Sequence, residues 1–420
     1  MASTLTVSSL ADNNIKLTYD TLLHMISVSL YASEAVKLMA TCQFLYHEGA
    51  KIALKRPIAI RNTKQLPSFL KFVRAENLTR CRHLRQLELW GCYPEPDIAQ
   101  ELAETIPLLL NIQHLRLHSV EDILEPYPAL LPAFAGLTSL RHLELYGAGG
   151  VACELLSTLQ APLVTASVDF LADSDEKIFD HLDFDEWAQY HPTRLLANFA
   201  STLEELQCIA WYTTSEPVFP GTVYSNMRKL SIELHDFPLR MDAFARAFPN
   251  LTDLRVRTEY HGGDIAHADF ESIQASRHTN LFTWRQLGGA WRNGLEHFSG
   301  CLVDLYGVGL ACPIRRVTIV DALPDGLSTD VLATVLRAAR PVHLRLQGVA
   351  GAMLGDAERG LIAMLQDESA SGLLNLALCV NFGADDREED LRAVIVRVLS
   401  TLPPVVRSRG TDREFTFTDS

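Results

Sequence analysis

A recurring leucine pattern constrains this chain more than any other feature. The pattern is a leucine, two variable residues and Leu-x-Leu, and it first appears at residues 84–89. The central apolar residues lie 28 or 24 residues apart, at Leu87, Leu115 and Leu143, then at Leu206, Leu230 and Leu254. Weaker copies occur at 163–170, 314–319, 344–346 and 373–378. The alternation predicts short strands with every second side chain buried, and such units must stack because none can bury its apolar face alone.

Helix-like segments separate the predicted strands. They are Asp97–Leu110, Val151–Leu159, Met241–Phe248, Asp330–Ala339 and Glu388–Leu399. A short strand followed by a helix in each unit resembles the leucine-rich repeats. We therefore expect an α/β fold, a curved parallel-sheet solenoid of roughly ten irregular repeats over residues 56–420, with its first strand at Arg56–Ile60.

Three stretches depart from the regular spacing. An insert near residues 169–199 carries eight acidic residues and one lysine between Asp169 and Glu186, which predicts a solvated loop or a docking surface for a basic partner. Between Leu254 and Val317 we expect one or two disguised units, with Trp284, Trp291 and Phe298 in the core. The terminal Glu414–Phe417 segment is either a closing strand or a frayed tail.

Composition excludes several classes of protein. A formal net charge of −14 over 420 residues argues against a chain that coats nucleic acid or an anionic membrane. Eight cysteines at irregular spacing, without a C-x-x-C pair, predict reduced thiols in a cytoplasmic or nuclear protein. No apolar stretch reaches the roughly 20 residues of a membrane span, and the N-terminus lacks the basic start of a secretory signal.

The N-terminal residues do not fit the repeat. We expect residues 1–14 to be disordered and residues 15–55 to form a small helical module. Its predicted helices cover Asp20–Leu30, Ser33–Leu45 and His47–Leu54, where apolar residues recur at helical spacing.

This module resembles an F-box. The resemblance rests on Leu17, on Leu22-x-x-x-Ile26-x-x-x-Leu30 and on Leu38-x-x-x-Cys42, although Thr18 and Gln43 replace the proline and arginine of the family pattern. An F-box ahead of divergent leucine-rich repeats is common among fungal proteins. The resemblance implies that Leu17, Leu22, Ile26, Leu30, Leu38 and Cys42 pack against a Skp-type adaptor and against each other.

The function that this resemblance implies is recognition without catalysis. The repeats would hold a protein substrate for a Skp–cullin–F-box ubiquitin ligase. One alternative is an interaction scaffold in which the helical module is only an N-terminal cap. Another is a nucleotide-dependent enzyme, because Gly147-Ala-Gly149-Gly-Val-Ala152 follows a strand and precedes a helix, as in a dinucleotide-binding turn.

We expect no cofactor and no metal. The glycine turn lies within an array of similar units, which lacks the strand-order reversal of a dinucleotide fold. His114, His118 and His142 lie on neighbouring predicted strands, but His114 and His118 are about 13 Å apart along one strand, too far to share an ion.

The predicted binding surface is the concave face of the sheet. Reading outward positions across the units gives a charged ladder of Glu88, Arg116 and Glu144, and an aromatic strip of Trp90, His118 and Tyr146. Exposed aromatic residues beside arginine are typical of protein-binding hot spots, although these rings could instead only shield the sheet. Equivalent positions further along turn basic and suit an acidic or phosphorylated partner: Lys229, Arg255, Arg257, Arg316 and Arg345.

Overall fold

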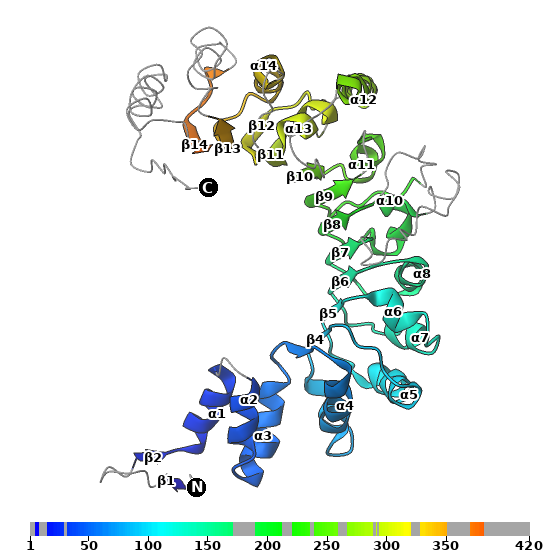
Figure 1. The fold of residues 1–420 in the computed structure, drawn as a ribbon, viewed down its shortest axis with the longest axis vertical. Coiled ribbons are helices and arrows are strands. Elements are labelled where there is room, and N and C mark those ends of the chain that lie inside the picture. Colours follow the sequence, from blue (N-terminus) through cyan, green and yellow to red (C-terminus); the bar gives the residue numbers. More distant parts are fainter. Residues whose placement is uncertain are drawn as a thin grey trace. The chain divides into compact units, whose positions relative to one another are not determined.

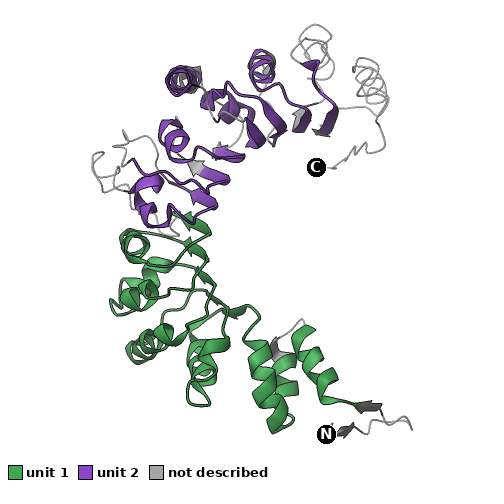
Figure 2. Ribbon diagram, turned by 180° about the vertical axis from the view of Figure 1, so that it is seen from behind, with its two compact units in different colours: residues 1–178 green, residues 179–420 purple. Residues whose placement is uncertain are grey.

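The computed structural model describes residues 5–7, 15–28, 32–170, 190–211, 221–235, 239–258, 267–288, 291, 294–320, 328–350 and 370–381 (Figure 1). The chain divides into two compact units, residues 1–178 and 179–420 (Figure 2). We expected a separate module and one continuous array from residue 56. The helical module lies within the first unit, and the domain boundaries that we expected stay a prediction.

The first unit opens with a short antiparallel strand pair, β1 (Leu5–Val7) and β2 (Ile15–Leu17). The prediction of disorder over residues 1–14 is therefore wrong for β1. Two three-residue segments with alternating apolar side chains pair there, with Leu5 opposite Leu17 and Val7 opposite Ile15.

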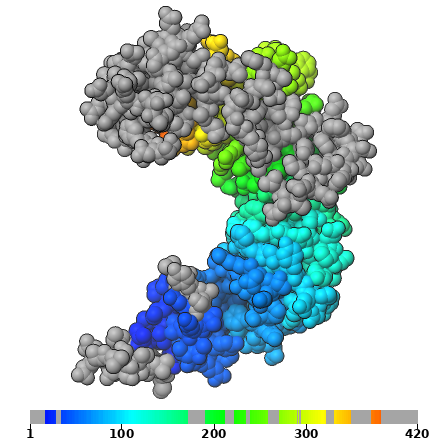
Figure 3. All heavy atoms as spheres, in the orientation of Figure 1, coloured from blue at the N-terminus to red at the C-terminus, as the bar shows by residue number. Residues whose placement is uncertain are grey.

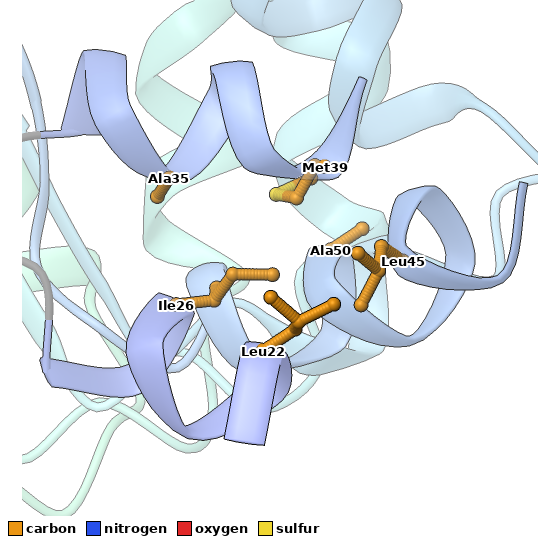
Figure 4. Close-up of a cluster of buried hydrophobic side chains, with 6 residues drawn as sticks. All are labelled: Leu22, Ile26, Ala35, Met39, Leu45 and Ala50. Atoms are coloured by element: carbon orange, nitrogen blue, oxygen red, sulfur yellow. The ribbon is translucent and has the colours of Figure 1, made fainter. Parts of the chain in front are cut away.

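Three helices follow and form the helical module: α1 (Tyr19–Val28), α2 (Ala32–Met39) and α3 (Gln43–Ala53). Their apolar faces share one core, whose members are Leu22, Ile26, Ala35, Met39, Leu45 and Ala50 (Figure 4). The expected second helix was too long, because α2 ends at Met39 and Cys42 is the N-cap of α3. Gly49 matters here, since an added Cβ would lie 2.7 Å from Ile26 and 2.8 Å from Met39.

The rest of the first unit alternates strands with helices. Its elements are β3 (Ile58–Ile60), η1 (Thr63–Gln65), α4 (Leu66–Arg74), η2 (Cys81–His83), β4 (Gln86–Leu89), α5 (Pro96–Thr105), η3 (Ile106–Leu108), β5 (His114–Leu117), α6 (Val120–Leu124), α7 (Leu130–Ala135), β6 (His142–Tyr146), α8 (Gly150–Thr158) and β7 (Thr165–Asp169). The helices lie on one side of the strands (Figure 1). Leu87 and Leu89 are buried on that side, whereas Gln86 and Glu88 keep partial exposure on the other.

The second unit has the same alternation. Its elements are α10 (Pro192–Leu195), η5 (Ala197–Phe199), β8 (Glu205–Ile209), β9 (Lys229–His235), α11 (Asp242–Ala247), β10 (Asp253–Thr258), α12 (His267–Gln286), β11 (Leu295–Gly300), α13 (Leu302–Val308), β12 (Ile314–Ile319), α14 (Ser328–Ala339), β13 (His343–Ala350) and β14 (Asn375–Asn381). The predicted segments Glu388–Leu399 and Glu414–Phe417 lie outside the described residues.

The strands β3 to β14 form one parallel twelve-stranded sheet, in chain order and not closed into a barrel. The central apolar residues of the repeat pair directly across neighbouring strands: Leu87 with Leu115, and Leu115 with Leu143. Within the described residues, the predicted repeat strands and their register are therefore confirmed. The chain is a mixed α/β protein built on a parallel sheet.

Irregular stretches resolve into ordinary elements where the structure describes them. The described part of the region between Leu254 and Val317 contributes one strand, β11. Its Phe298 takes the leucine position and pairs with Leu254 of β10 and with Val317 of β12. Trp284, Trp291 and Phe298 are buried as expected. Residues 190–199, which we assigned to the insert, instead supply α10 and η5, because Leu195, Leu196 and Phe199 are apolar and buried.

The described helices include none that is both long and apolar enough to cross a bilayer.

Candidate functional site

The candidate site is the open face of β4, β5 and β6, which we define as the face opposite the helices. Parallel pairing in register places Glu88 beside Arg116 and Arg116 beside Glu144. Neighbouring parallel strands lie about 4.8 Å apart, so side chains at one register position meet across the sheet. The structure thus brings together the predicted charged residues.

Arg116 holds the charged ladder together. Its Nε and Nη2 donate to the two carboxylate oxygens of Glu144 at 2.6 and 2.8 Å, and its Nη1 donates to Glu88 Oε1 at 3.0 Å. Partial burial, the largest single cause, would raise the pKa of both carboxyls. The bonds and charge of Arg116, together with bonds from Trp90 and His118 to Glu88 and from Tyr146 to Glu144, outweigh burial and lower each pKa below its usual value. Each nitrogen of the Arg116 guanidinium thus bonds a carboxylate of the ladder, and the ladder carries one net negative charge.

The aromatic strip is a stack of three rings along the ends of the same strands. The Trp90 and His118 ring centroids lie 3.5 Å apart at 18°, and those of His118 and Tyr146 lie 4.4 Å apart at 5°. Trp90 remains 42% exposed, so part of its side chain is accessible to a partner. The predicted strip is confirmed as an arrangement; its role in binding stays a prediction.

Hydrogen bonds join the stack to the charged ladder. The Tyr146 hydroxyl donates to Glu144 Oε2 at 3.0 Å, and His118 Nε2 lies 3.3 Å from Glu88 Oε1. Burial, followed by the bond to Glu144, raises the pKa of Tyr146 to about 12. Burial also lowers the pKa of His118 despite the nearby carboxylate, so its ring is neutral near pH 7.

A left-handed turn follows each ring of the stack. Gly91, Ser119 and Gly147 come directly after the three rings and have φ angles of 49°, 53° and 65°. This region favours glycine and costs an ordinary residue about 1–2 kcal/mol. The turn sends the chain from the strand toward the helix side while the ring stays on the open face.

A second stack involves histidines alone and forms no metal site. The His114 and His142 rings lie 4.0 Å apart at 8°, and His142 Nδ1 lies 2.7 Å from Thr165 Oγ1. Within the described ranges, no three His, Cys, Asp or Glu side chains gather in a way that could hold an ion.

The glycine turn before α8 already holds an anion, which is a carboxylate of the same chain. Glu121 accepts from the backbone N–H groups of Gly149 at 2.6 Å, Ala152 at 2.8 Å and Val151 at 3.2 Å. A Cβ at Gly149 would lie 2.6 Å from the Glu121 side chain, so glycine is required for this close approach. The position that a dinucleotide phosphate would occupy is filled, which weighs against the nucleotide-dependent alternative.

The residues predicted to face an adaptor divide by burial. Ile26 and Leu22 are 0% and 6% exposed inside the module core, so Ile26 offers a partner no surface in this fold. Leu17, Leu38 and Cys42 are partly buried at the edge of that core, and Leu30 lies outside the described residues. The predicted packing of these side chains against each other is confirmed for Leu22 and Ile26.

The exposed apolar side chains of the module are different ones, which the sequence analysis missed. Twelve large apolar residues are exposed in the described part of the chain, and five of them belong to this short module: Met25, Val28, Val36, Phe44 and Tyr46. Their positions between the core positions of each helix are the only signal in the sequence that could have identified them.

A buried arginine joins the module to the first repeat. Arg80 is 1% exposed and donates to Glu76 Oε1 at 2.7 Å, and its guanidinium lies over the rings of Tyr46 and Phe72 at 4.4 and 4.6 Å. Glu76 also bonds His47 of α3. The module surface, in dark blue, runs without a break into that of the repeats (Figure 3).

No protein-family model matches this chain, and no curated protein matches it either.

Proposed function

We propose that this protein is a substrate-recognition subunit of a Skp–cullin–F-box type ubiquitin ligase and has no catalytic activity of its own. The observation that carries the proposal is the helical module. Its three helices have a complete core and still present five large apolar side chains to solvent, directly ahead of an array of strand–helix units. Large apolar side chains left exposed in such number on a short module are suited to burial against another protein.

The repeat array supplies the second half of the proposal. Its units resemble leucine-rich repeats, and the open face of β4–β6 offers a stacked aromatic strip beside partly exposed carboxylates. Large aromatic side chains dominate binding energy at protein interfaces. We infer that a protein substrate contacts Trp90 and Tyr146, with Glu88, Arg116, Glu144 and His118 maintaining the shape and charge of that face.

The test is co-purification with a Skp-type adaptor. Val28 and Val36 are 58% and 60% exposed, so Val28→Asp combined with Val36→Asp should abolish capture of the adaptor and leave circular dichroism unchanged. Val223→Asp is the matched control, because Val223 is 53% exposed and lies outside the module.

Two outcomes would contradict the proposal. The first is a wild-type chain that captures no adaptor, which would favour the interaction scaffold with the module as a cap. The second is full capture by the folded double variant. Ile26→Asp is a poor test, because it places a charge in the module core and should unfold it.

A further inference from the structure

The open face of the second unit is basic. Its outward positions on β8 to β13 carry five cations and three carboxylates, which are Lys229, Arg255, Arg257, Arg316 and Arg345 against Glu205, Glu233 and Asp253. This excess reverses the sign of the whole chain, whose formal net charge is −14. The basic character is therefore local to this face.

Among the described residues, neither Arg316 nor Arg345 has an acidic partner. Lys229 bonds Glu205 at 2.6 Å, and Arg255 lies 3.8 Å from Glu233. Arg316 and Arg345 are both exposed, and no carboxylate of the described residues lies within ion-pair distance of either. Exposed guanidinium groups without a carboxylate can bind an external anion without first breaking an internal ion pair.

Strand register places these two arginines around one hydroxyl. Arg345 of β13 pairs with Thr318 of β12, and Arg316 precedes Thr318 by two residues on the same face. The two arginines are therefore diagonal neighbours, about 7–8 Å apart at their backbones. Thr318 Oγ1 lies 3.3 Å from His297 Nε2 of β11, on the opposite side of β12 from Arg345, and this contact orients the hydroxyl.

Neighbouring side chains orient Arg345 rather than neutralise it. With the Gln347 amide turned so that its oxygen faces the arginine, it accepts from Nε at 3.0 Å and from Nη2 at 3.1 Å. The Nη1–Nη2 edge of the guanidinium remains for a ligand. His343, which pairs with Arg316 across the strands, bonds Asn375 and carries no compensating negative charge.

We propose that this face binds a phosphorylated serine or threonine in a peptide segment, with Arg316 and Arg345 bonding the phosphate oxygens and Thr318 donating its hydroxyl. A phosphate monoester offers three oxygens and nearly two charges, which matches two guanidinium groups and one hydroxyl. A carboxylate has only two oxygens and one charge. A long polyanion such as nucleic acid would extend beyond the basic face and meet an acidic chain.

The role of this face in selecting a ligase substrate rests on the proposed function. The binding of a phosphorylated peptide to the face does not depend on it. The probes are three biotinylated peptide libraries with degenerate flanks. Their central residue is phosphoserine, serine or glutamate. Each is incubated with the full chain, without adaptor, and the captured protein is measured.

The phosphoserine library should capture at least about tenfold more protein than either of the others. Arg316→Gln combined with Arg345→Gln should reduce phosphoserine capture about a hundredfold, because each loses a charge-assisted contact worth tenfold or more. The matched control is Arg315→Gln with Arg337→Gln, which removes two charges from other exposed positions of the second unit and should retain capture.

Equal capture of the three libraries would overturn the inference, as would phosphoserine preference in the Arg316 and Arg345 variant. Adaptor co-purification, measured on the same variant, should be unchanged. In the wild-type chain, absence of phosphoserine preference with adaptor capture intact would refute only this inference. Absence of adaptor capture with peptide preference intact would refute only the proposed ligase function.

Discussion

Arg80→Met is the substitution that tests the junction between the helical module and the repeats. Methionine keeps most of the apolar stem, so the change removes the charge and little packing. Arg80 is 1% exposed and makes two hydrogen bonds to Glu76, at 2.7 and 3.2 Å, and two ring contacts. Bonds between charged groups contribute about 1.5–3 kcal/mol, and each cation–π contact about 0.5–1 kcal/mol.

The expected net loss is smaller than the sum of these contributions. Burying a cation carries a desolvation cost that the substitution relieves, and Glu76 remains partly exposed to water at 27%. We therefore expect Arg80→Met to lower the free energy of unfolding of the first unit by about 2–3 kcal/mol. In a unit of 178 residues, this corresponds to a fall in Tm of about 5–10 °C.

The assay is thermal unfolding followed by circular dichroism, with hydrogen exchange over residues 43–80 to localise the effect. Arg82→Met is the matched control, since Arg82 is exposed two residues away. A cycle with Glu76→Gln should give a coupling of at least about 1 kcal/mol. A Tm for Arg80→Met equal to that of the Arg82 control, or additive effects in the cycle, would show that the junction does not depend on Arg80.

Three further predictions concern the repeats of the first unit. Glu121→Ala leaves three backbone N–H groups at the N-terminus of α8, those of its N-cap Gly149 and of Val151 and Ala152, without this acceptor. The change should cost about 1–3 kcal/mol in thermal unfolding, whereas added dinucleotides should leave the Tm of the wild type unchanged. Trp90→Ala with Tyr146→Ala should abolish capture of substrates in cells while adaptor capture persists; an unchanged set of partners would place the binding surface elsewhere. Arg116→Met should weaken the acid dependence of stability. The lowered pKa of Glu144 stabilises the fold above its unfolded value of 4.5, and this contribution is lost as pH falls, so the wild type should lose more stability than the variant between about pH 5 and pH 3; parallel pH curves would refute this.

Local pattern determined much of the repeat architecture. A strand exposes alternate side chains to opposite faces, and parallel units stack at equal register, so the positions of Glu88, Arg116 and Glu144 beside one another follow from their spacing of 28 residues. The same spacing of 28 residues predicts the aromatic strip, even though Trp90 and His118 lie one residue beyond the ends of β4 and β5. The strand around Phe298 was expected only as a disguised unit without bounds, because an aromatic residue replaces the leucine.

Tertiary packing alone decided which predicted residues are available to a partner. Each helix of the module is amphipathic, and this property does not say whether its apolar face meets another helix of the chain or a partner; packing buries Ile26 and exposes Val28 and Val36. Likewise, nothing in the sequence around Gly149 shows that Glu121, 28 residues earlier, occupies the glycine turn, nor does any repeat position mark Arg80. These contacts join side chains that share no periodic relation, so only the folded chain brings them within bonding distance.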